Sequence, residues 1–286
     1  MGTFIGHVVP SLAFTLLGLW HTINTTKSYK LHGPSNFTSA AWFPFPKIRR
    51  LELYLLLVFS LLAIAFNLLL DDHHHGHHPL LSSLEHASMF LHLVIFAAAA
   101  FAADLSPSPE AWASLVGALS ASAFGQELFL LRFHSADHAG LEGHYHWLLQ
   151  VIVAASFAAT VASVGMPSSF VVAIIRSATI TCQGLWLAVM GCVLWVPRLL
   201  PEGCYASAAS AADRLGAVQC PTEDAARRVT AVANLQFSWM VAGVSILTTS
   251  LSLRPEGKRM EYRQLQPRGG SGGESDESLK QGHSSV

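Results

Sequence analysis

Seven long apolar runs dominate the sequence and constrain its fold more than any other feature. The runs cover approximately residues 4–23, 51–70, 84–103, 111–131, 147–164, 170–196 and 229–253. An α-helix of about 20 residues is long enough to cross a hydrocarbon core about 30 Å thick. Only 12% of the 286 residues are charged, whereas soluble domains carry about 25%. The sequence therefore predicts an all-α membrane protein, a bundle of seven transmembrane helices in a lipid bilayer.

Residues 254–286 differ in composition from the predicted transmembrane domain, residues 1–253. They are rich in Gly, Ser and charged residues, which predicts a disordered C-terminal tail. With seven spans, the loop at 24–50 and this tail share one side of the membrane, where eleven of the 17 Lys and Arg lie, against five on the other side. Lys and Arg favour the cytoplasmic side. We therefore expect a cytoplasmic tail and a luminal or extracellular N-terminus.

Two other features bear on this orientation. Cys204 and Cys220 share the loop before the last span, which this orientation places in an oxidising compartment where they could pair. Glycosylation sequons at Asn24 and Asn36 fall on the predicted cytoplasmic side and would stay unused. Glycosylation at either position would contradict the orientation. The net charge of −1 gives no broad basic face, so nucleic acid is not an expected partner.

Ionisable side chains gather near the predicted luminal ends of four spans. His7 opens the first span, His86 opens the third, Glu127 lies near the end of the fourth, and His146 directly precedes the fifth. Ionisable groups inside a bilayer are costly and usually mark a pathway, a relay or a binding site. Their shared depth predicts that these side chains meet in one pocket.

This set of residue types is typical of zinc sites. Catalytic zinc usually has three protein ligands and a water molecule, whose pKa it lowers to about 7. Glu127, His134 and His138 are spaced i, i+7, i+11, which keeps them on one helical face. The predicted metal ligands are His7, His86, His134 and His146, with His138 as a further candidate. The predicted catalytic residue is Glu127, which would act as general base or as a further ligand.

Three functions fit these residues. The first is a zinc-dependent membrane hydrolase acting on a lipid substrate. The second is a metal-ion or proton transporter with the His-rich run 73–78 as a vestibule, but it needs a polar path to the cytoplasmic side, where the sequence offers only Glu52, Asp104 and Arg176. The third is a non-catalytic membrane adaptor whose histidines only hydrogen-bond across helices.

Several short motifs resemble those of the transmembrane protein 45 family, a group of multipass membrane proteins with a domain of unknown function. They are Gly6-His7 with Pro10, Gly18-Leu19-Trp20, Arg50-Leu51-Glu52, His86 with Met89, Asp104, Glu127 with His134 and His146, Gln183-Gly184 with Trp186, and Trp239. The segment HSADHAGLEGHYH at 134–146 is closer to the plant branch, and Met240 stands where animal members have His. The resemblance covers about residues 1–250. It implies seven helices, endomembrane or plasma-membrane residence and roles in stress or pathogen response, but no particular reaction.

Overall fold

The computed structural model describes residues 4–69, 79–133, 140–206 and 218–255. Within these residues, seven helices are long and apolar enough to cross a membrane, as the sequence predicted. They are α1 (Phe4–His32), α2 (Leu51–Leu69), α3 (Pro79–Leu105), α4 (Ala113–Arg132), α5 (Gly140–Gly165), α6 (Phe170–Trp195) and α7 (Glu223–Leu253). Two short 3-10 helices, η2 (Pro109–Trp112) and η3 (Pro197–Leu199), and an antiparallel pair of strands, β1 (Tyr205–Ala206) and β2 (Val218–Gln219), connect them. The chain is an integral multipass membrane protein.

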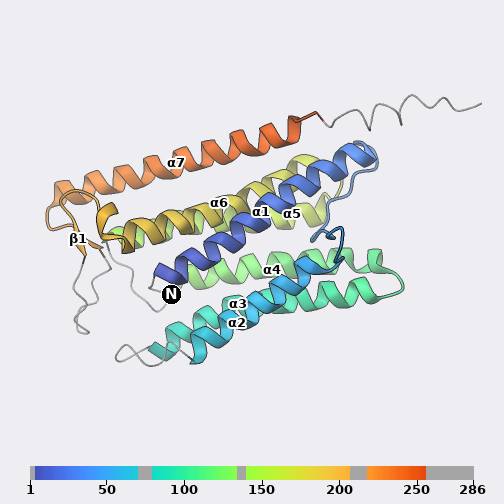
Figure 1. Ribbon diagram of the computed structural model, residues 1–286, viewed down its shortest axis with the longest axis horizontal. Coiled ribbons are helices and arrows are strands. Elements are labelled where there is room, and N and C mark those ends of the chain that lie inside the picture. The colour runs from blue at the N-terminus through green and yellow to red at the C-terminus, as the bar shows by residue number, and fades with distance from the viewer. Residues whose placement is uncertain (1–3, 70–78, 134–139, 207–217, 256–286) are drawn as a thin grey trace, which may run out of the picture. The chain divides into compact units, whose positions relative to one another are not determined.

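The helices pack as two groups that α4 and α5 join. One group consists of α2, α3 and α4, which lie side by side (Figure 1). In the other group, α6 packs against both α1 and α5. A large apolar core lies where α5, α6 and α7 meet, around the fully buried Trp186 and Met190. A smaller core around Leu53, Phe96 and Val116 holds α2, α3 and α4 together.

Helix α1 continues well beyond its apolar run, through residues that the sequence analysis assigned to a loop. Thr25 and Thr26 are buried there, and the hydroxyl of Thr26 lies 3.4 Å from that of Ser252 on α7. The side-chain amide of Asn24 donates a 2.8 Å hydrogen bond to the carbonyl of Trp20. The Asn24 sequon therefore lies within a packed helix, whereas glycosylation acceptors are normally in surface loops.

Glycines let α1 and α6 approach each other closely. A Cβ atom added at Gly18 would overlap Thr181, and one added at Gly184 would overlap both the backbone nitrogen and the side chain of Thr15. Small residues at helix interfaces are the usual route to close packing in membranes, where apolar burial provides little force between helices. This contact fixes the position of α1, the helix that carries His7.

A disulfide closes the connection between α6 and α7. Cys204 and Cys220 are paired, next to the short β1–β2 ladder. Cys182 and Cys192, both on α6, are free. The connection begins directly after the C-terminal end of α6, so the disulfide lies at the same end of the bundle as Trp195.

Candidate functional site

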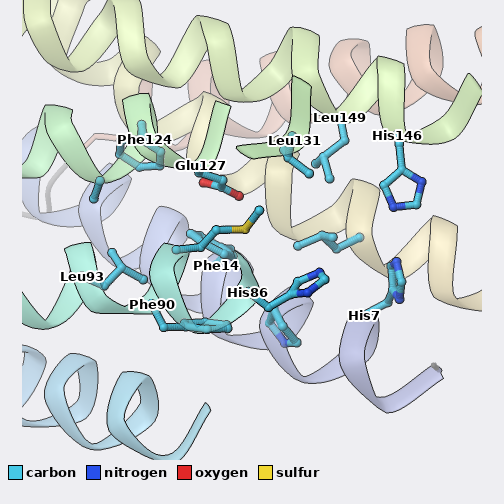
Figure 2. A pocket seen from close by; sticks show the side chains of 14 residues that line it. His7, Phe14, His86, Phe90, Leu93, Phe124, Glu127, Leu131, His146 and Leu149 are labelled. Atoms are coloured by element: carbon cyan, nitrogen blue, oxygen red, sulfur yellow. The ribbon is translucent and has the colours of Figure 1, made fainter. Parts of the chain in front are cut away.

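A cavity of about 80 Å³ lies inside the bundle, lined by residues of α1, α3, α4, α5 and α6. Four of the residues singled out in the sequence line it: His7, His86, Glu127 and His146. Figure 2 shows their side chains directed toward the same space. The rest of the lining is largely apolar, with phenylalanines and leucines from all five helices. Four polar side chains therefore share one mostly apolar cavity.

The three imidazoles come from three different helices. The ring of His7 on α1 packs at a tilt against that of Trp195, with 4.5 Å between the centroids. It lies edge-on to the ring of His146 on α5, at 6.0 Å. His7 and His86 are 3% and 8% exposed, so both are largely shielded. In Figure 2, the imidazoles of His7, His86 and His146 lie toward one end of the cavity.

Backbone carbonyls orient two of these rings. The Nδ1 atom of His86 lies 2.7 Å from the carbonyl oxygen of Ser82, and Nδ1 of His146 lies 2.9 Å from that of Glu142. A carbonyl oxygen can only accept, so Nδ1 carries the proton in both rings. In a neutral ring of this tautomer, Nε2 is the atom with the lone pair.

Glu127 on α4 lies deeper in the same cavity. Its Oε1 accepts a 2.6 Å hydrogen bond from the side-chain amide of Gln183 on α6. Gln183 is fully buried, and its Oε1 has no hydrogen-bond partner among the described residues. Figure 2 places the Glu127 carboxyl apart from the imidazoles. The link between Gln183 and Glu127 is not evident from the sequence, because the two lie on different helices, 56 residues apart.

The structure does not bring the whole predicted ligand set together. His134 and His138 lie outside the described residues, as does the His-rich run 73–78. Among the residues that are described, no three His, Cys, Asp or Glu side chains are placed to hold one metal ion. His144 points elsewhere, since its Nε2 lies 2.8 Å from the side-chain oxygen of Asn234. Metal binding and the catalytic role of Glu127 therefore stay predictions.

A second polar cluster, which the sequence analysis did not predict, joins α1 to α2. The carboxyl group of Glu52 on α2 accepts hydrogen bonds from Trp20 Nε1 at 2.9 Å and from the backbone nitrogen of Phe43 at 2.9 Å. Its other oxygen lies 2.8 Å from His21 Nε2. His21 and Glu52 are each 4% exposed. The sequence indicates only that the end of the first helix and the start of the second lie on one side of the membrane, and not that these side chains meet.

Arg176 on α6 extends this cluster. Its guanidinium donates a 2.5 Å hydrogen bond to the carbonyl of Ala40 and interacts electrostatically with Glu52. In the connection between α1 and α2, just before Glu52, Arg49 and Arg50 both pair with Asp104 at the end of α3. The distances are 2.7 Å and 2.6 Å. These contacts attach the connection between α1 and α2 to the ends of α3 and α6.

Residues 113–253, from the start of α4 to the end of α7, match the model of a family described as "Family of unknown function (DUF716)". A DUF716 family domain is thus found at residues 113–253. This agrees with the expected likeness to a family built on a domain of unknown function. The DUF716 domain contributes Glu127, His146 and Gln183 to the site. His7 and His86 come from helices that precede the DUF716 domain, so the cavity needs both parts of the chain.

Proposed function

We propose that the cavity binds a divalent transition-metal ion, with zinc as the first candidate, through His7, His86 and His146. The three imidazoles would have to move closer together on binding, since the structure does not place them around one ion. The convergence of three imidazoles from three helices in one intramembrane cavity carries this proposal. Zinc binds imidazole nitrogen at about 2.0–2.1 Å, so the ring centres of two histidines on one ion lie about 5–6 Å apart. The 6.0 Å between His7 and His146 is close to this spacing.

The hydrogen bonds of His86 and His146 also favour metal binding. Metal-bound histidines commonly donate their second ring nitrogen to a backbone carbonyl or carboxylate, which fixes the tautomer and orients the ring. The Nδ1 contacts to Ser82 and Glu142 have this form. They present Nε2, the second nitrogen of each ring, as the ligand atom.

The size of the cavity favours an ion over a lipid. About 80 Å³ holds a metal ion with a few water molecules, whereas sites for drug-sized molecules occupy about 300–1,000 Å³. Hydrolysis of a lipid with Glu127 as general base would require the cavity to widen, so we place metal binding first. Glu127 then serves as a carboxylate in the same cavity, held by Gln183 and apart from the imidazoles.

We also propose that the cavity lies near the luminal or extracellular leaflet of an endomembrane or the plasma membrane. The distribution of Lys and Arg supports this orientation. The Cys204–Cys220 disulfide supports it too, because disulfides persist in oxidising compartments. Membership in the plant branch of the transmembrane protein 45 family is a proposal that rests on the sequence motifs.

Elemental analysis of detergent-purified protein tests metal binding directly. We expect about one zinc ion per chain in the wild type, after supplementation with zinc and removal of the excess. The His7→Ala/His146→Ala variant should lose most of it. His92→Ala is the matched control, because His92 lies on the same helix as His86 but does not line the cavity. Equal metal in all three proteins, or none in the wild type, would refute the proposal and favour a purely structural polar cluster.

A further inference from the structure

We infer that the end of the bundle where α1 connects to α2 binds the headgroups of anionic phospholipids, through Lys27 and Lys47. This inference is independent of the proposed metal site. Residues 24–50 contain five Lys and Arg and no Asp or Glu. Their positive charge complements that of acidic lipids, which attract basic segments next to a membrane.

Lys27 lies on the face of α1 that is directed toward lipid. Exposed apolar side chains follow this face at helical spacing, from Leu16 through Ile23 to Leu31. Lys27 is exposed as well and lies four residues from both Ile23 and Leu31. Residues four apart in a helix share one face. The ammonium group of Lys27 therefore extends from the lipid-facing side of the helix.

The depth of the two lysines matches the headgroup layer. The apolar run of α1 ends near Ile23, and Lys27 lies about 6 Å beyond it at 1.5 Å per residue. The hydrocarbon core is about 30 Å thick and the whole bilayer about 40–45 Å, which leaves about 5–8 Å for headgroups on each side. Lys47 is exposed and lies four residues before Leu51, where α2 and its apolar run begin. Both ammonium groups therefore lie near the depth of lipid phosphates.

Aromatic packing holds the backbone near both lysines in place. The ring of Tyr29 stacks on that of Phe170 on α6, with 4.2 Å between the centroids, and the ring of Phe45 stacks on that of Trp20 at 3.9 Å. Within the part of the chain that the structure describes, neither lysine forms an ion pair with a carboxylate. Two fixed positive charges thus face the layer of the bilayer that contains lipid phosphates.

Basic residues at the opposite end of the bundle lie beside carboxylates. Arg227 pairs with Glu223, and a guanidinium nitrogen of Arg228 lies 3.8 Å from a carboxylate oxygen of Glu202. These carboxylates offset the positive charge of their arginines. The excess of positive charge that would select anionic lipids is therefore concentrated in the connection between α1 and α2.

Native mass spectrometry of the delipidated full-length protein tests this inference. Separate titrations with phosphatidylserine and phosphatidylcholine give the Kd of the first bound lipids. One Lys near an anionic membrane surface contributes about 1 kcal/mol, or about fivefold in affinity, so the wild type should prefer phosphatidylserine by at least that factor. Lys27→Gln/Lys47→Gln should weaken phosphatidylserine binding by about fivefold and leave phosphatidylcholine binding unchanged. Arg198→Gln is the matched control, because Arg198 is an exposed arginine at the opposite end.

Ionic strength provides a second measurement that needs no variant. The preference of the wild type for phosphatidylserine should fall as salt is added, because salt screens the attraction between exposed charges. Equal affinity of the wild type for the two lipids would refute the inference. A preference that persists in Lys27→Gln/Lys47→Gln, or that Arg198→Gln weakens to the same extent, would show that the lipid binds elsewhere and that these lysines are wrongly assigned.

Discussion

Buried carboxyl groups show how single residues hold this bundle together. Removing one partner from such a pair leaves the other buried and unpaired, which costs more than the pair itself contributes. Glu52, Asp104 and Glu127 each accept hydrogen bonds from residues on another element. Their surroundings differ, however, since Asp104 meets two arginines and Glu127 meets a neutral amide. The consequences of mutation should differ accordingly.

Asp104→Ala should lower the free energy of unfolding by about 2 kcal/mol, because it leaves two guanidinium groups without their carboxylate. The side chain of Asp104 is only 4% exposed, while that of Arg50 is 27% exposed. Thermal unfolding in detergent, followed with a thiol-reactive dye that reports exposure of the buried Cys182, measures the change. Glu223→Ala is the control, because Glu223 forms an exposed pair with Arg227. This substitution should lower the free energy of unfolding by less than about 0.5 kcal/mol. Equal effects of the two variants would contradict this ranking.

Glu127 and Gln183 should be energetically coupled. Hydrogen bonds between membrane helices contribute about 0.6 kcal/mol on average and up to about 1.7 kcal/mol. The contact at 2.6 Å between partners on α4 and α6 belongs near the upper end of that range. A double-mutant cycle with Glu127→Gln and Gln183→Leu measures the coupling from the same unfolding assay. Additive effects of the two substitutions would show that the contact contributes nothing.

Among the helices, α1 and α6 depend most on close backbone approach. Their contact faces carry Gly18 and Thr15 on one helix and Thr181 and Gly184 on the other. Hydropathy alone cannot reveal this pairing, because α1 and α6 are separated by four transmembrane helices in the chain. The same contact orders the polar end of α1, which the sequence analysis read as a loop. There the hydroxyl of Thr26 meets that of Ser252 on α7, so a helix can continue where hydropathy falls.

Gly184→Ala should destabilise the protein by about 1–3 kcal/mol, the usual cost of overpacking a close interface. The added methyl group would overlap the backbone of Thr15, which cannot move without shifting α1. Gly243→Ala on α7 is the matched control, since nothing lies within 4 Å of a Cβ atom built there. Its effect should stay within about 0.5 kcal/mol. Zinc content should also fall in Gly184→Ala, because α1 carries His7.

At the scale of the whole molecule, the sequence was sufficient to predict the transmembrane helices and some of the residues that line the cavity. Apolar runs predict spans because lipid offers no hydrogen bonds to the backbone. His7, His86, Glu127 and His146 could be grouped because alternating spans bring alternate helix ends to one side. The Gln183 and Glu52 contacts could not be predicted, because they depend on which helices are neighbours and how each is rotated. Hydropathy carries no information on either.

The orientation of the molecule can be tested through its cysteines. In sealed microsomes whose cytosolic face is outward, a membrane-impermeant maleimide should label neither Cys204 nor Cys220, even after a permeant reductant opens their disulfide. Both should react once detergent opens the vesicles. Cys182 and Cys192 are replaced with Ala so that labelling reports only this pair. The positive charges predict this result, because the loop between α6 and α7 lies opposite the Lys- and Arg-rich side. Labelling in sealed vesicles would place the disulfide loop in the cytosol. The imidazole end of the cavity would then face the cytosol and not the lumen or exterior.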